Sequence, residues 1–269
     1  MEKFIDVEKI INSKRPALLR WLPAFVINYL KRIIHQDEIN RFIEKHHDKK
    51  NEAFCQEVIR YFNIEIEVEN IERIPKEGKV TLAMNHPLGG MDAMVLVTAL
   101  REHRSDLRFI VNDILMNLDN LKDLFVGVNK IGKYNSSMRE KITHLFESDH
   151  AVCVFPAGLV SRKTKGIVKD TDWKKTFVSY SKKFDRTVIP IYIDGKLSNF
   201  FYRLANFRRF LGMKLNIEML YLSDELFKQH NKRIRVIIGE PVQVHELHLS
   251  SDDNAMAQKI KQKVYDLQS

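Results

Sequence analysis

The chain has 269 residues, 44% of them hydrophobic, which is enough to bury the core of one α/β domain with additions. Its two cysteines exclude a disulfide framework and a cysteine-based metal site. The formal net charge of +9 favours an anionic partner, such as a membrane, an acidic carrier protein or nucleic acid.

The start of the chain carries no sign of export. Residues 1–6 lack the basic start and the apolar stretch of a signal peptide. No segment reaches the ~20 consecutive apolar residues that are needed to span a bilayer. We therefore expect a cytoplasmic protein whose membrane contact, if it has one, is peripheral.

Residues 1–62 are predicted to form an N-terminal helical region. Its most apolar stretch runs from Trp21 to Leu30 and has basic residues on both sides. Such a stretch can lie in the membrane interface, where its cations meet anionic headgroups. It can equally be a helix packed on the core, and the sequence leaves both interpretations open. Residues 63–269 are predicted to form an α/β domain.

Two strands are predicted next. Residues 64–68 alternate strictly between apolar and acidic, which is typical of a half-buried strand, and residues 80–84 are a continuous apolar run, typical of a buried one. After the second strand come His86, two glycines and a helical pattern that begins near Asp92. His86 should therefore lie at the carboxyl end of a strand, the edge where open α/β sheets bind ligands.

The His86–Asp92 pair can carry out base catalysis. A carboxylate that holds one ring N–H fixes the tautomer, so the other nitrogen is free to take a proton from an attacking group. No side-chain nucleophile lies nearby in the sequence, so the substrate's own hydroxyl would be the nucleophile. The alternative is a helix-capping Asp92 and a loop histidine without a chemical role.

A second loop follows another strand. Residues 107–111 are predicted to form a strand, residues 112–126 are helical or irregular, a helix runs to about residue 148, and residues 151–155 form an apolar strand. That strand leads into Phe-Pro-Ala-Gly, in which Gly158 permits close backbone approach. Ser161 and Arg162 suit a phosphate or a carboxylate. This loop should face His86 across the edge of the sheet.

The remaining chain adds helices over 174–184 and 251–267 and strands over 188–193 and 234–238, with Pro190 suited to an edge strand or a bulge. Between them, residues 199–212 form an amphipathic helix with an aromatic face and several arginines. A core helix with solvated arginines is slightly favoured for it, and contact with a membrane is the alternative.

Three blocks resemble the glycerophospholipid acyltransferase superfamily, in its haemolysin-like and bacterial aminolipid branch. Asn85-His86-Pro87-Leu88-Gly89-Gly90-Met91-Asp92 resembles the first signature block, with the Asp six positions after the His where five is usual. Phe155-Pro156-Ala157-Gly158-Leu159-Val160-Ser161-Arg162 resembles Phe-Pro-Glu-Gly-Thr-Arg-Ser, with Ala157 where the family has Glu. Val188-Ile189-Pro190-Ile191 is similar to the closing Val-Pro-Val block. The order and spacing of the three blocks match the family.

The resemblance implies a single α/β domain with a mixed sheet flanked by helices, and the transfer of a fatty acyl group to a hydroxyl of a lipid. His86 would be the general base, and Asp92 would orient it. The donor would be a thioester of acyl carrier protein or coenzyme A, with no metal or redox cofactor, and the enzyme would work at the inner face of the cytoplasmic membrane. The residues expected to contact substrate are Asn85, Gly89, Gly90, Lys130, Phe155, Pro156, Gly158, Ser161 and Arg162.

Within the acyltransferase interpretation, two lipid acceptors are open. Lysophosphatidic acid is the commonest acceptor in the family and is our main prediction. The Gly-Gly form of the first block and Ala157 favour a lyso-aminolipid of the N-acyl amino acid type instead. Lys130 and Lys133 stand where the family has a phosphate-gripping Arg, so the acceptor's headgroup is open. A non-catalytic membrane-binding protein on the same fold is the alternative of another class. Nucleic-acid binding is not expected, because the basic residues are dispersed.

Overall fold

The computed structural model describes residues 4–14, 21–112, 118–128 and 136–268. The chain forms two compact units. The larger one comprises Lys50–Lys196 and His230–Ser269, and the smaller one comprises Met1–Lys49 and Leu197–Gln229. Lys130 and Lys133, proposed for the acceptor's headgroup, lie outside the described residues.

The larger unit is built on a mixed seven-stranded sheet with the order β1-β9-β8-β2-β5-β3-β4. Only the β8–β9 pair is antiparallel, and the other neighbours within this sheet run parallel. The strands are β1 Glu65–Glu69, β2 Val80–Met84, β3 Leu107–Asn112, β4 Phe125–Val128, β5 Ala151–Val154, β8 Thr187–Ile193 and β9 Arg233–Ile238. A separate hairpin joins β6 Arg162–Thr164 to β7 Ile167–Lys169. The predicted α/β fold with a mixed sheet is confirmed.

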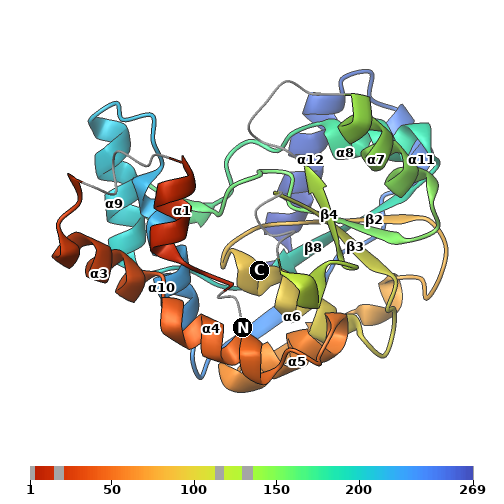
Figure 1. Cartoon of the computed structure of the whole chain (residues 1–269). Helices are drawn as coiled ribbons and strands as arrows, with labels where there is room; N and C mark the ends of the chain where they lie inside the picture. The colour runs from red at the N-terminus through yellow and green to blue at the C-terminus, as the bar shows by residue number, and fades with distance from the viewer. Residues whose placement is uncertain (1–3, 15–20, 113–117, 129–135, 269) are drawn as a thin grey trace. The chain divides into compact units, whose positions relative to one another are not determined.

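Helices cover both faces of this sheet (Figure 1). Helices α5 (Asn51–Tyr61) and α6 (Gly90–Leu100) lie on one face, and the other carries α7 (Ser136–Glu147), α8 (Thr176–Lys183), α11 (Val244–His248) and α12 (Asp253–Asp266). Strands covered on both faces should be apolar throughout. All residues of β2 and β5 are accordingly buried.

Helix α5 buries Phe54, Cys55, Val58 and Ile59, packs against α6 and belongs to the larger unit, while residues 197–229 belong to the smaller one. Two sequence predictions differ from this arrangement. Strand β4 begins at Phe125, within the range 112–126 for which helical or irregular structure is predicted. Pro190 lies in β8 between β2 and β9, where it fits because it faces Gly239, whose missing Cβ would lie 2.9 Å from the proline Cγ.

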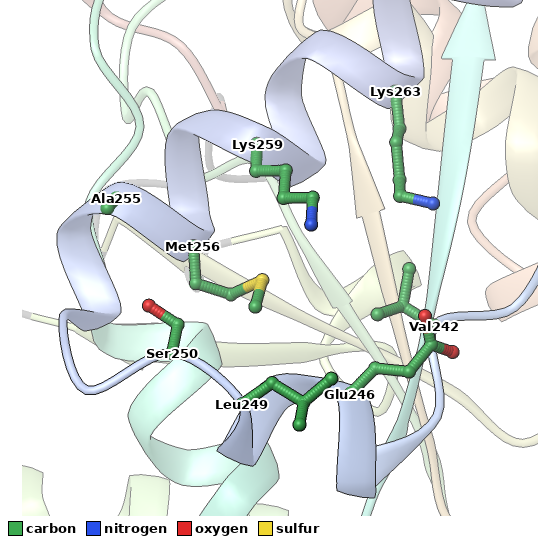
Figure 2. A pocket seen from close by; sticks show the side chains of 8 residues that line it. All are labelled: Val242, Glu246, Leu249, Ser250, Ala255, Met256, Lys259 and Lys263. Carbon is green, nitrogen blue, oxygen red and sulfur yellow. The ribbon is translucent and has the colours of Figure 1, made fainter.

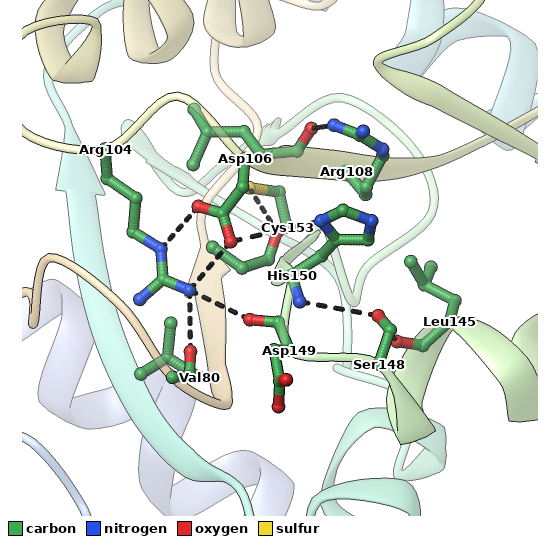
Figure 3. A network of polar contacts seen from close by, with 12 residues as sticks. Val80, Arg104, Asp106, Arg108, Leu145, Ser148, Asp149, His150 and Cys153 are labelled. Carbon is green, nitrogen blue, oxygen red and sulfur yellow. Dashed lines mark hydrogen bonds and ion pairs between the residues drawn. The ribbon is translucent and has the colours of Figure 1, made fainter.

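Two buried arginines hold backbone carbonyls near the start of β2. Arg186, fully buried, donates to the carbonyls of Phe146 (2.7 Å) and Val80 (2.8 Å). Burial lowers its pKa to about 10. Arg104 bridges the Asp106 carboxylate (2.7 Å) and the Asp149 carbonyl (3.0 Å), as Figure 3 shows. These bonds satisfy acceptors that would otherwise be buried without a partner.

The smaller unit is helical in the part of the chain that the structure describes. Its elements are α1 Val7–Lys14, α3 Ala24–Ile33, α4 Gln36–Lys45, α9 Asn199–Phe210, the 3-10 helix η4 Ile217–Tyr221 and α10 Leu222–Phe227. Trp21 is 86% exposed and Phe25 is 74% exposed, so the core-packing interpretation of this stretch is wrong for these two residues. Across the described ranges, no helix has the length and apolarity to cross a bilayer.

Candidate active site

Asn85 fixes the start of the loop that carries His86. The amide nitrogen of its buried side chain donates to the Ile193 carbonyl (2.8 Å), and its amide oxygen accepts the Ile193 N–H (2.7 Å). These two bonds tie the end of β2 to the end of β8. His86 is therefore held at the carboxyl edge of the sheet, as predicted, and the Asn85 amide is used to hold it there.

His86 and Asp92 are in direct contact. His86 Nδ1 lies 2.8 Å from Asp92 Oδ2, and the fully buried carboxylate also accepts the Leu88 N–H (3.0 Å). The two side chains can meet across six sequence positions because the backbone turns sharply at Gly89. This glycine has φ +70° and ψ −132°, a conformation that L side chains rarely adopt, and α6 begins at the next residue, Gly90. A carboxylate in the first turn of a helix is also favoured by the helix dipole.

The surroundings of Asp92 shape its electrostatics. Burial raises the pKa of the Asp92 carboxyl, while the hydrogen bond and the charge of His86 act in the opposite direction. Because the Asp92 carboxylate is fully buried, an ion pair between it and a protonated imidazole is stronger than the same pair would be in water. The carboxylate therefore lies where it would stabilise a positive charge on the His86 ring.

The second loop supports the imidazole from the side. Phe155 follows β5, and its ring stacks on that of His86, with centroids 4.2 Å apart and planes 29° apart. The side chain of His86 is 19% exposed. Within the part of the chain that the structure describes, Nε2 has no hydrogen-bond partner. Asp92 thus holds Nδ1 and Phe155 holds the plane of the ring, which leaves Nε2 as the ring nitrogen without a partner among the described residues.

Gly158 closes the turn after Phe155. Its φ is +66°, and its N–H donates to the Phe155 carbonyl (2.9 Å). A Cβ at this position would lie 3.4 Å from Lys174 Nζ, so the lysine amine lies beside the glycine backbone. The buried Pro156 accepts the Lys174 N–H (3.1 Å) through its carbonyl. Lys174 thereby places a positive charge at this turn.

A buried carboxylate, Asp170, joins the two loops. Its Oδ1 accepts the Ser161 hydroxyl (2.6 Å) and the His86 N–H (3.3 Å), and its Oδ2 accepts Trp173 Nε1–H (2.9 Å). Ser161 also donates its backbone N–H to the His86 carbonyl (2.8 Å). The peptide of His86 is therefore held on both sides, and the Ser161 hydroxyl is used to hold it.

Sequence reasoning missed Asp170. It follows the short strand β7, lies 84 residues from His86 in the chain, and stands in none of the three motif blocks. The local sequence offers only an aspartate, Asp170, followed three positions later by a tryptophan, Trp173. This spacing does not indicate a contact with His86.

Other predicted site residues have distinct surroundings. Gly89 is buried and Gly90 is exposed at the start of α6, where backbone N–H groups lack helical partners. Arg162 is buried, and its Nη1 donates to the Val160 carbonyl (2.7 Å). Ala157 is buried in the cluster that contains Trp173, so its methyl group contributes to packing.

The model of the family described as "Acyltransferase" matches residues 9–269. The chain belongs to the acyltransferase family.

Two relatives of this acyltransferase cover almost its whole length. It is 41% identical over 264 residues to a lyso-glycine lipid O-acyltransferase of Bacteroides thetaiotaomicron, which covers 98% of this chain and 97% of the relative. It is 39% identical over 264 residues to a lyso-glycine lipid O-acyltransferase of Phocaeicola vulgatus, with 98% and 95% covered. The predicted family is thereby confirmed.

A solved structure shares the fold of the acyltransferase. It is the 1-acyl-sn-glycerophosphate (LPA) acyltransferase of Thermotoga maritima, with a TM-score of 0.52, 15% identity, and 97% of this chain and 92% of that chain covered. At 15% sequence identity, this similarity shows only that the two proteins share a fold.

The acyltransferase also has a pocket of about 240 Å³ between α11 and α12 (Figure 2). Its lining includes Val242, Leu249, Met256 and two lysines, Lys259 and Lys263. None of its eight lining residues belongs to the three motif blocks, and it contributes nothing to the site around His86.

Proposed function

We propose that this acyltransferase transfers a fatty acyl group from a thioester to a hydroxyl of a lyso-glycine lipid. The observation that carries the proposal is the identity of 41% and 39%, over nearly the full length, to two lyso-glycine lipid O-acyltransferases. These relatives support the aminolipid alternative better than lysophosphatidic acid, our main sequence prediction. The buried Ala157, where the family has a Glu tied to acceptor binding, is consistent with a different acceptor.

In the proposed reaction, His86 Nε2 takes the proton of the acceptor hydroxyl as its oxygen attacks the thioester carbonyl. Asp92 holds Nδ1–H and stabilises the imidazolium. The tetrahedral intermediate then collapses, its carbon–sulfur bond breaks, and the thiolate leaves with the proton from His86. Backbone N–H groups at Gly89 and Gly90 would stabilise the oxyanion. The N–H of Gly158 is less suited, because it closes the turn at Phe155.

The partners follow from this chemistry. The donor would be a thioester of acyl carrier protein or of coenzyme A, because a thiolate leaves readily without a metal. The acceptor is a lipid, so the enzyme would act at the inner face of the cytoplasmic membrane. Buried Arg162 and the amine of Lys174 would supply positive charge for an anionic acceptor group.

The alternative of a non-catalytic membrane-binding protein on this fold is less well supported. It predicts that His86 and Asp92 lie well beyond hydrogen-bond range, because the extra residue between them would separate the pair. Their nitrogen–oxygen distance of 2.8 Å is an ordinary hydrogen bond.

An acceptor panel tests the proposal. The purified protein would be given labelled acyl carrier protein or acyl coenzyme A with lyso-glycine lipid or lysophosphatidic acid. We expect an O-acylated product from lyso-glycine lipid with at least one donor. Product from lysophosphatidic acid alone would overturn the acceptor, and no product from any of the four pairs would favour the non-catalytic alternative.

Asp170 provides a test of the positioning of His86. Asp170→Asn keeps an oxygen for Ser161 and the His86 N–H, but turns an amide N–H₂ toward Trp173 Nε1–H, so two donors meet. We expect the resulting shift of the loop to lower kcat by roughly tenfold to a hundredfold with a small change in KM.

The matched control is Trp173→Phe, which removes the opposing donor. The double variant Asp170→Asn/Trp173→Phe should recover part of the lost kcat, because the donor conflict is gone. A loss of thermal stability with unchanged kcat would show that Asp170 acts on the fold and not on the position of His86.

A further inference from the structure

The segment from Asn199 to Ile217 combines exposed apolar side chains with an absence of acidic residues. It contains no Asp or Glu over its 19 positions, while the arginines and lysine number four. The exposed large apolar residues are Phe200 (48%), Phe207 (58%), Phe210 (85%), Leu211 (53%), Met213 (39%) and Leu215 (73%). We call these six residues the α9 apolar surface.

Helix α9 carries Phe200, Phe207 and Phe210 of this surface on the side opposite its buried residues, and the other three follow the helix. The Ser198 hydroxyl caps the helix by accepting the Phe201 N–H (3.2 Å). Phe201, Tyr202 and Ala205 are buried and hold the helix in the smaller unit. The favoured core interpretation of the Phe200, Phe207 and Leu211 face is therefore wrong: this face is the exposed one.

The loop after α9 is held in place by Arg208. Its Nη1 donates to the Met213 carbonyl (2.7 Å), and its Nε lies 2.9 Å from Oε2 of Glu218, which is fully buried. The Met213 N–H returns a bond to the Arg208 carbonyl (3.1 Å). These bonds fix the loop that carries Leu211 and Leu215, and they turn the charge of Arg208 inward.

The cations that remain exposed lie among the apolar residues. Arg203, Arg209 and Lys214 are exposed, and the segment offers no carboxylate beside them before the buried Glu218. Monomeric soluble proteins rarely expose a large contiguous apolar patch unless it meets a partner or a membrane. A surface of large apolar side chains with cations among them matches a bilayer with anionic headgroups.

We infer that the α9 apolar surface is the site at which this protein docks on an anionic lipid bilayer, with Phe210 and Leu215 inserted and Arg209 and Lys214 at the headgroups. A second copy of the chain is a poorer occupant, because self-pairing would bring like charges together without acidic partners. The inference goes beyond the proposed function and does not need it, because docking can be measured without acyl transfer.

Helix α3 of the same unit can share in this contact. The Tyr221 hydroxyl lies 2.7 Å from that of Tyr29, and the Tyr221 ring meets Phe200 edge-on at 4.9 Å. Helices α3 and α9 are therefore both joined to η4. Trp21 and Phe25 are exposed and precede Tyr29 in the sequence, so their replacement is a second variant for the same assay.

Vesicle sedimentation of the full chain tests the inference. The probes are vesicles of phosphatidylcholine alone and of phosphatidylcholine with phosphatidylglycerol. We expect binding to the anionic vesicles, weakened by salt, and a loss of at least ~tenfold in Phe210→Ser/Leu215→Ser, because each buried side chain of this size contributes more than a tenfold factor. The variant should keep its thermal stability, since both side chains are exposed.

The matched control is Leu249→Ser, which removes a leucine that is 84% exposed beside α11 (Figure 2). It should bind vesicles like the unaltered protein. Equal binding by Phe210→Ser/Leu215→Ser, or no binding of the unaltered chain to anionic vesicles, would overturn the inference. A dimer that the double variant dissociates, with vesicle binding unchanged, would assign the surface to a second copy and overturn it as well.

Discussion

His86→Ala should abolish most acyl transfer while leaving the fold intact. A positioned general base contributes roughly 10²–10⁴-fold to the rate, and Nε2 of His86 is the nitrogen left available by its bond to Asp92. The side chain is partly exposed at the edge of the sheet and fills no core position. Turnover should therefore fall by at least ~100-fold with little change in the thermal unfolding midpoint.

The control for this variant is His245→Ala, which removes an exposed histidine of α11. It should transfer the acyl group at the normal rate, so that a general effect of losing a histidine is excluded. The measurement is the initial rate with saturating donor and acceptor, beside a thermal unfolding curve for each protein. Near-normal turnover of His86→Ala would remove His86 from the mechanism.

The local part of this site could be predicted from the sequence. His86 and Asp92 are joined by one turn between a strand and a helix, so an apolar run followed by turn residues suffices to place both. Phe155 could also be placed near the edge, because it follows a strand as His86 does. The stacking of the two rings required knowledge that β2 and β5 are neighbours, which a single sequence does not contain.

Contacts across long sequence distances could not be predicted. The hydrogen bond from the His86 N–H to Asp170 spans 84 residues. The motif that contains Ser161 predicts that its hydroxyl contacts the substrate, whereas in the structure this hydroxyl donates to Asp170. The amphipathic pattern of residues 199–212 identifies the apolar face of a helix. It does not show whether that face packs in the core or is exposed. Only the position of the helix in the smaller unit shows that Phe207 faces outward.

Asp92→Asn should separate activity from stability. The asparagine oxygen would accept the Leu88 N–H, which turns the amide N–H₂ toward His86 Nδ1. Nδ1 must then accept, the ring proton moves to Nε2, and the base is lost. The same tautomer error in a Ser-His-Asp triad lowers kcat by about 10⁴-fold. We expect a loss of turnover comparable to that of His86→Ala.

The stability of this variant should depend on pH with a definite sign. Burial raises the pKa of Asp92 above 3.8, so the folded protein holds this proton more tightly than the unfolded chain. Ionisation of Asp92 therefore destabilises the folded protein once the pH rises above 3.8. This destabilisation reaches its full value above the raised pKa. Asparagine does not ionise and avoids this cost.

The free energy of unfolding of Asp92→Asn should thus increase relative to that of the unaltered protein as the pH rises from about 4 toward neutrality, so the variant becomes relatively more stable. Urea unfolding of both proteins at a series of pH values measures this difference. A difference that does not change with pH would mean that Asp92 has no raised pKa. A stabilised and inactive variant would show that the buried carboxylate is kept for its effect on His86, at a cost to the fold.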